Sequence, residues 1–170
     1  MKTFKIAAIP GDGIGSEVIS AGVEVLEALA SREEGLAFTF DEFDWGGDYY
    51  LKHGRMMPED GREQIRNHDA ILFGSAGHPD IPDHITLWGL RLAICQPFDQ
   101  YANVRPTRVL PGITSPLRNV NDGELDWVIV RENSEGEYAG VGGRVHQGSP
   151  LEAATDVAMF TRAGVERVMR

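Results

Sequence analysis

The chain has 170 residues, 42% hydrophobic, 25% charged and 8% aromatic, as expected of a globular protein with a buried core. Lys and Arg number 16 against 26 Asp and Glu, and the net charge of −10 excludes nucleic acid as an expected partner. The single cysteine, Cys95, excludes an intrachain disulfide and a multi-cysteine metal site. The early apolar run at residues 6–9 is too short for a signal segment or a membrane span, so we expect a cytoplasmic protein that binds no membrane.

Short apolar runs that alternate with helical patterns predict an α/β fold. Residues 4–9 form the first expected strand, followed by a glycine turn at 11–15 and a helix. The residues of this helix expected to face the core are Val18, Gly22, Val25, Leu26 and Leu29. Further strands are expected at 37–43, 70–73 and 127–130. The last places Arg131 and Glu132 at its C-terminal end, where ligands bind in open α/β sheets.

The second half of the chain carries two further signals. Residues 106–116 contain three of the nine prolines, which predicts a connection between two lobes. Residues 161–170 have a helical pattern, with Val165, Val168 and Met169 expected inward. No capping signal ends this helix, so we expect a truncated chain whose apolar faces are left partly uncovered.

Two glycine-rich loops follow predicted strands. The first does not match the Rossmann fingerprint G-x-G-x-x-G, because the third glycine is replaced by Ser16. Either loop can be a plain turn, or it can bring backbone N–H groups close to a ligand. The candidate cofactor-binding residues are Gly11, Asp12, Gly13, Ile14, Gly74, Ser75, Ala76, Gly77 and His78.

Arg105, Arg131 and Tyr138 form the candidate substrate site. Two guanidinium groups can each bind a carboxylate through paired hydrogen bonds, which suits a dicarboxylate. A neighbouring tyrosine can donate a proton to an atom that has gained charge. Taken alone, an arginine is more often a solvated surface residue, and a tyrosine more often packs as an amphipathic side chain. The carboxylates of Glu132, Glu135 and Glu137 alternate, which predicts a solvated strand face, and the five histidines show no zinc-ligand spacing.

Three segments resemble the isocitrate/isopropylmalate dehydrogenase family in order and spacing: GDGIGSEV from Gly11, FDQYANVRP from Phe98 and VRENSEGEYAG from Val130. Four others resemble its tartrate dehydrogenase/decarboxylase and D-malate dehydrogenase branch: WGGDYY from Trp45, RMMP from Arg55, ITLWG from Ile85 and ENSEGEY from Glu132. The resemblance covers the whole chain and implies the two-lobe isopropylmalate dehydrogenase-like fold rather than a Rossmann fold. Residues 1–100 would begin the first, cofactor-side lobe, and 101–170 would begin the second.

The resemblance also implies NAD-dependent oxidation and β-decarboxylation of a small 2-hydroxy dicarboxylate such as tartrate or D-malate. Mg or Mn would assist, and a monovalent cation such as potassium is compatible. Tyr138 would protonate the enolate, Arg105 and Arg131 would hold the carboxylates, and the two glycine loops would border NAD. The family forms homodimers, and its catalytic lysine, metal-binding aspartates and adenosine loop lie downstream of residue 170. No metal ligand is therefore expected in this segment, and the chain alone is expected to be inactive.

One departure from the family pattern affects the substrate site. Cys95 stands where the family places another carboxylate-binding arginine, and a thiol cannot replace that cation. Arg91 lies one helical turn earlier and could compensate, or it could alter the choice of substrate. Two other interpretations stay open. One is an isopropylmalate or isocitrate enzyme, and the other is a degenerate, non-catalytic paralogue that acts as a binding module.

Overall fold

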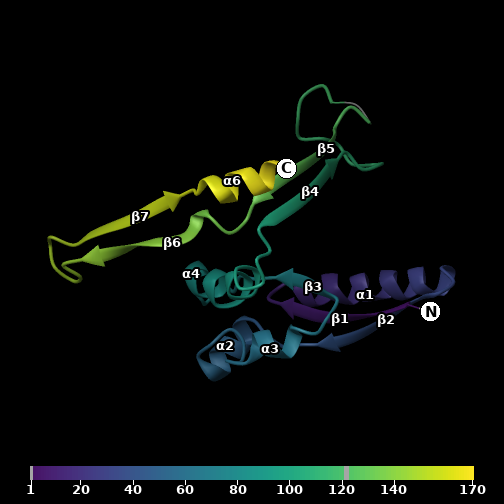
Figure 1. Cartoon of the computed structure of the whole chain (residues 1–170), viewed down its shortest axis with the longest axis horizontal. Helices are drawn as coiled ribbons and strands as arrows, with labels where there is room; N and C mark the ends of the chain where they lie inside the picture. Colours follow the sequence, from purple (N-terminus) through teal and green to yellow (C-terminus); the bar gives the residue numbers. More distant parts are fainter. Residues whose placement is uncertain (1, 121–122) are drawn as a thin grey trace. The chain divides into compact units, whose positions relative to one another are not determined.

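The computed structural model describes residues 2–120 and 123–170, which divide into two compact units, residues 1–94 and 95–170 (Figure 1). Which lobe each unit represents stays a prediction. In the described part of the chain, no helix has both the length and the apolar character needed to cross a bilayer.

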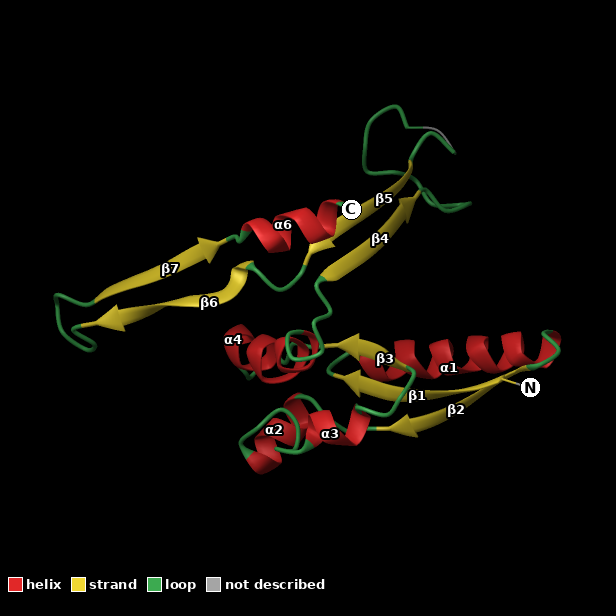
Figure 2. Cartoon of the chain, in the orientation of Figure 1, coloured by secondary structure: helices red, strands yellow, loops and turns green. Residues whose placement is uncertain are grey.

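A three-stranded parallel sheet forms the centre of the first unit (Figure 2). β1 (Lys2–Gly11) lies between β2 (Leu36–Glu42) and β3 (Ala70–Ser75) and pairs with both. Its apolar run is covered on both faces, because neighbouring side chains point to opposite faces and Ala8 and Ile9 are both buried, at 2% and 0% exposure. The strands predicted at 4–9, 37–43 and 70–73 are confirmed, because an apolar run bounded by glycine turns is typical of a buried parallel strand.

Helices connect the strands of this sheet. α1 (Gly15–Arg32) joins β1 to β2, and α2 (Gly47–His53) and α3 (Gly61–Ile65) lie between β2 and β3. A helical run follows β3, made of α4 (Asp83–Thr86), η1 (Leu87–Arg91) and α5 (Leu92–Cys95). These helices bury Leu90 and Leu92 and complete the core of the unit.

The predicted core face of α1 is confirmed at Gly22 and Leu26 and wrong at Val18, Val25 and Leu29. Val18, Val25 and Leu29 are 49%, 67% and 42% exposed, whereas Ile19 is buried. The rotation of the helix is set at its first residue, because Gly15 packs its Cα against Pro10 and Gly74. Residues 15, 19, 22 and 26 therefore face the sheet, and the second apolar stripe of the helix stays outside.

Two antiparallel strand pairs and one helix form the second unit. β4 (Ala102–Arg108) pairs with β5 (Asp126–Glu132), and β6 (Gly136–Val145) pairs with β7 (Ala153–Met159). α6 (Arg162–Met169) packs against β5. The strand predicted at 127–130 and the helix predicted at 161–170 are confirmed.

Two expectations for this unit are wrong. Residues 106–116 do not connect the two units, because Pro106 lies in β4 opposite Val128 and the following segment joins β4 to β5. Proline is tolerated in a strand when its nitrogen is not needed in the ladder. Val165 and Met169 of α6 are 40% and 79% exposed rather than buried. The expected uncovered apolar surface is confirmed, with Trp127, for example, 56% exposed.

Candidate functional site

The turn after β1 brings the backbone of the first glycine loop against the end of β3. Gly11 and Gly13 have φ values of 71° and 54°, in the left-handed region that favours glycine. A Cβ at Gly11 would collide with the carbonyl oxygen of Ser75, and one at Gly15 with that of Pro10. These two glycines allow close backbone approach. Around Gly13, by contrast, no described atom would meet a Cβ within 4 Å, so its backbone is open to a ligand.

Asp12 ties three loops together. Its side chain is buried, and one carboxylate oxygen accepts a short hydrogen bond from the backbone N–H of Gly47. The other oxygen accepts from the backbone N–H of Gly77 at 2.8 Å, while the N–H of Asp12 donates to Ser75 at 2.9 Å. Charge-assisted bonds to backbone donors are among the stronger ones in proteins. Asp12 therefore fixes the two predicted cofactor loops relative to each other.

The second loop begins where β3 ends. Gly74 has no room for a Cβ beside Pro10, whereas Gly77, at φ 151°, has open space at that position. The ring of His78 packs on Gly47, and its Nδ1 accepts from the N–H of Asp80 at 3.2 Å. The structure thus gathers the predicted cofactor residues at the C-terminal edge of a parallel sheet, which is where ligands bind in this class of fold.

Arg131 and Tyr138 contact each other directly in the second unit. Arg131 Nη2 donates a hydrogen bond to the phenol oxygen of Tyr138 at 2.8 Å, and the guanidinium carbon lies 5.1 Å from the centre of the tyrosine ring. The same nitrogen pairs with Glu137 at 3.0 Å. Both residues border a pocket of about 360 Å³. Its other lining residues are Glu132, Glu135, Gly136, Glu137, Ala158 and Phe160.

Arg105 shares a face of the β4–β5 pair with Arg131. Asn103 pairs with Arg131 across the ladder and Arg105 pairs with Ile129, so the two arginines are diagonal neighbours on one face. Arg105 is exposed, and its Nε donates to Asn103 at 2.7 Å. The register therefore brings the two predicted carboxylate-binding side chains to one surface, although the structure shows no direct bond between them.

The predicted solvated face of Glu132, Glu135 and Glu137 is wrong for the first two residues. Glu132 accepts hydrogen bonds from the hydroxyl and N–H of Ser134 and from the N–H of Glu135, at 2.5–2.9 Å. Burial raises the pKa of Glu132. This effect is outweighed by the hydrogen bonds from the Ser134 side chain and the two backbone N–H groups and by the positive charge of Arg167, so the pKa lies below its ordinary value. Only Glu137 is exposed.

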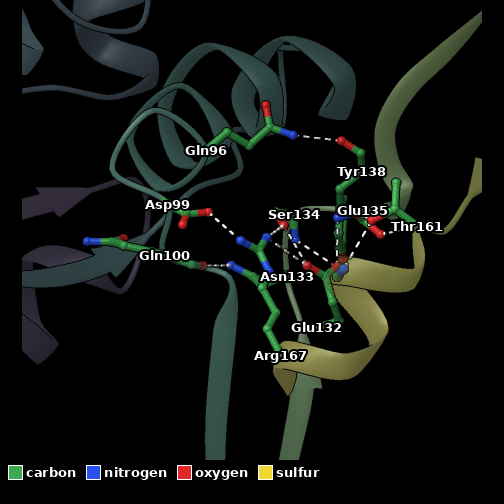
Figure 3. A network of polar contacts seen from close by, with 11 residues as sticks. Gln96, Asp99, Gln100, Glu132, Asn133, Ser134, Glu135, Tyr138, Thr161 and Arg167 are labelled. Carbon is green, nitrogen blue, oxygen red and sulfur yellow. Dashed lines mark hydrogen bonds and ion pairs between the residues drawn. The ribbon is translucent and has the colours of Figure 1, made fainter. Parts of the chain in front are cut away.

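A network of polar contacts surrounds this segment (Figure 3). Glu135 accepts from the hydroxyl and N–H of Thr161, while Gln96 donates to the carbonyl oxygen of Tyr138 at 2.7 Å. Arg167 reaches Asp99 and Ser134 from α6. Sequence reasoning missed Gln96 and Arg167, which lie far from Tyr138 along the chain and outside the quoted motifs, and it assigned no role to Asp99, although Asp99 lies in the FDQYANVRP segment.

Arg91 and Cys95 lie one turn apart near the end of the helical run. Arg91 ends η1 and Cys95 ends α5, and both side chains are half-buried. Because these residues are four positions apart in a helical segment, their side chains lie on the same face of it. Whether Arg91 replaces the missing arginine stays a prediction.

The described residues contain no group of three His, Cys, Asp or Glu side chains arranged to hold a metal ion. A divalent metal does not fit a site made from these residues alone.

Known proteins resemble this chain over its whole length. A probable tartrate dehydrogenase/decarboxylase of Agrobacterium vitis is 67% identical over 170 residues, and the decarboxylating D-malate dehydrogenase of Escherichia coli (strain K12) is 50% identical over 172. The matches cover 100% of this chain but 48% and 47% of those proteins. The chain thus spans about half the length of the curated relatives it matches.

Solved structures agree with these relatives. Isocitrate dehydrogenase from Methylococcus capsulatus matches with a TM-score of 0.79 at 31% identity, over 98% of this chain and 45% of that one. A beta-decarboxylating dehydrogenase from Thermococcus kodakarensis matches with a TM-score of 0.63 at 37% identity, over 97% and 43% of the two chains. The predicted fold and the predicted tartrate/D-malate branch are confirmed. Because the isocitrate/isopropylmalate dehydrogenase model also matches residues 5–170, the chain belongs to that family.

Proposed function

We propose that the full-length protein oxidises and decarboxylates a small 2-hydroxy dicarboxylate such as tartrate or D-malate. The observation that carries this proposal is the 2.8 Å hydrogen bond from Arg131 to the phenol oxygen of Tyr138. A guanidinium has donors and no acceptor, so Tyr138 must accept this bond and can direct its own proton elsewhere. The same cation stabilises the phenolate that remains after the proton has been given away.

The proposed chemistry has two steps. The C2 hydroxyl loses its proton and the C2 carbon loses a hydride to give a ketone; then the bond to the β-carboxylate breaks, releasing carbon dioxide and leaving an enolate. Tyr138 donates its proton to the enolate carbon. Arg105 and Arg131 hold the two carboxylates of the substrate, because paired N–H donors on one strand face match carboxylate oxygens.

NAD, when bound, accepts the hydride. The open backbone at Gly13 and Gly77 fits a flat or phosphate-bearing group, and Asp12 holds these two loops in register. Mg or Mn would stabilise the charge of the enolate, with ligands from the rest of the full-length protein, since the described residues contain no group of three metal-ligating side chains. A monovalent cation such as potassium is a further proposed cofactor.

The full-length protein is proposed to be a homodimer. The β6–β7 pair presents apolar side chains to solvent: Val145 is 58% exposed and Val157 46% exposed. Apolar surface of this kind is covered either by the rest of the full-length protein or by a second subunit, and for the β6–β7 pair the proposal assigns it to the second subunit. Size-exclusion chromatography with light scattering tests this proposal, and a monomer at micromolar concentration would contradict it.

The catalytic proposal is tested with Tyr138→Phe in the full-length protein. Removing the phenol hydroxyl should lower kcat for D-malate and tartrate by about 10²–10⁴-fold, the usual contribution of a general acid, with little change in substrate affinity. Tyr49→Phe is the matched control, since it also removes one phenol hydroxyl, Tyr49 is not among the proposed site residues, and its ring contact with His53, 4.3 Å between centroids, can be kept by phenylalanine. Equal kcat values for wild type and Tyr138→Phe would exclude Tyr138 as the proton donor.

A further inference from the structure

The segment that links Arg131 to Tyr138 is held by α6. Arg167, near the end of this helix, pairs through Nη1 with Asp99 at 2.9 Å and donates through Nη2 to the hydroxyl of Ser134 at 2.8 Å (Figure 3). The same Nη2 lies 3.8 Å from Glu132, and the guanidinium carbon sits 4.2 Å from the centre of the Tyr101 ring. One side chain therefore joins three segments that are far apart in sequence.

A second contact holds the same segment at the other end of α6. Glu135 accepts hydrogen bonds at 2.7 and 2.6 Å from the N–H and hydroxyl of Thr161, the N-cap residue of the helix. The helix carries Gly164 at the point where this carboxylate passes, and a Cβ there would collide with it. The segment between Arg131 and Tyr138 is thus attached to both ends of α6.

The other arginines of the C-terminal segment show that Arg167 is a special case. The side chains of Arg162 and Arg170 are 90% and 82% exposed, and the ion pairs shown for them are with Glu166 on the same helix. The side chain of Arg167 is 32% exposed, and its partners all lie outside α6. Surface pairs within a helix contribute little, whereas a half-buried arginine with several partners fixes geometry.

We infer that Arg167 is a positioning residue for the proton-donating pair of Arg131 and Tyr138. This inference rests on the proposed function, since it assigns the geometry of that same site. Arg167 holds Glu132 and Ser134, one and three positions after Arg131, while Gln96 and the carbonyl of Glu135 fix the backbone of Tyr138. Without Arg167 the segment gains freedom, and the phenol moves away from its productive position.

The test compares Arg167→Met with Arg162→Met in the full-length protein. A displacement of about 1 Å in a catalytic group can cost about 100-fold in rate, so Arg167→Met should lower kcat by about 10–100-fold, with KM for D-malate changed less. Arg162→Met removes an exposed arginine from the same helix and should stay within about threefold of wild type. Arg167→Lys should restore part of the loss, because an ammonium can reach Asp99 or Ser134 but lacks the fork that reaches both.

A double variant separates positioning from general damage to the fold. In a Tyr138→Phe background, Arg167→Met should lower kcat by less than about threefold further, because the group that it positions is already gone. Full additivity of the two losses would overturn the inference, as would an Arg167→Met rate equal to that of Arg162→Met.

Hydrogen exchange of peptides covering residues 132–138 gives a readout that does not depend on turnover. Arg167→Met should speed exchange there and leave β1 and β3 unchanged. Unchanged exchange at 132–138 would overturn the inference whatever the activity. If Arg167→Met speeds exchange at 132–138 but the wild-type protein turns over neither D-malate nor tartrate, the proposed function is refuted and the attachment of this segment by Arg167 is still supported.

Discussion

Removal of the Asp12 carboxylate should loosen both glycine loops at once. In Asp12→Ala the N–H of Gly47 is left without an acceptor in a buried position and that of Gly77 in a partly buried one. Hydrogen bonds to a charged acceptor contribute about 1.5–3 kcal/mol each, and the partial exposure of Gly77 reduces its share, so the free energy of unfolding should fall by about 2–4 kcal/mol. Asp12→Asn keeps one acceptor and should lose about half as much.

Urea titration of the full-length protein measures this loss, and hydrogen exchange at peptides containing Gly47 and Gly77 locates it. Asp48→Ala is the matched control, because the Asp48 side chain is 89% exposed and its carboxylate lies 4.0 Å from the imidazole of His78. The control should change stability by less than about 0.5 kcal/mol. If Asp12→Ala were as stable as the control, or if hydrogen exchange became faster elsewhere and not in the two loops, the carboxylate of Asp12 would not hold these loops together.

Three further predictions concern other parts of the two units. Gly11→Ala should lower the melting temperature at least twice as much as Gly13→Ala. Both substitutions place a side chain at a positive φ, which costs about 1–2 kcal/mol, but only a Cβ at Gly11 meets the backbone of Ser75. Equal melting temperatures would contradict this packing. Because the folded-state pKa of Glu132 lies below its ordinary value of 4.5, its stabilisation is present above that pH and is lost as pH falls. The melting temperature of Glu132→Gln should therefore depend less on pH between about pH 5 and pH 3, and parallel curves for wild type and variant would refute the pKa assignment. Cys95→Arg should raise kcat/KM for D-malate about 10-fold or more by restoring a charged contact, and Arg91→Leu should change it by less than about threefold. Loss of activity in Arg91→Leu would instead mean that Arg91 compensates for Cys95.

The central sheet of the first unit could be predicted from sequence, and the orientation of α1 could not. Apolar runs that end at glycine turns are a local signal, and β1 and β3 follow it closely. α1 is apolar on two adjacent stripes, so periodicity alone allows two rotations. The choice depends on the contact of Gly15 with Pro10 and Gly74, which is a tertiary contact.

The candidate site shows the same division between local and distant signals. Arg131 and Tyr138 are seven positions apart, and a motif that contains both made their proximity predictable. The alternation of Glu132, Glu135 and Glu137 suggested a solvated strand, but the chain turns after Glu132 and sends two of the carboxylates into the polar network. Arg167 lies 29 residues beyond Tyr138 along the chain. No local sequence pattern distinguishes it from Arg162 or Arg170.

The most direct test of the proposed chemistry is the ratio of carbon dioxide to NADH formed by the full-length protein. The assay uses D-malate and, separately, tartrate, with NAD, Mn and potassium present, and measures both products in the same reaction. Oxidation followed by decarboxylation predicts one carbon dioxide for each NADH with D-malate. In Tyr138→Phe the rates at which both products form should fall by the same factor as kcat. No NADH from either substrate, or NADH from D-malate without carbon dioxide, would contradict the account.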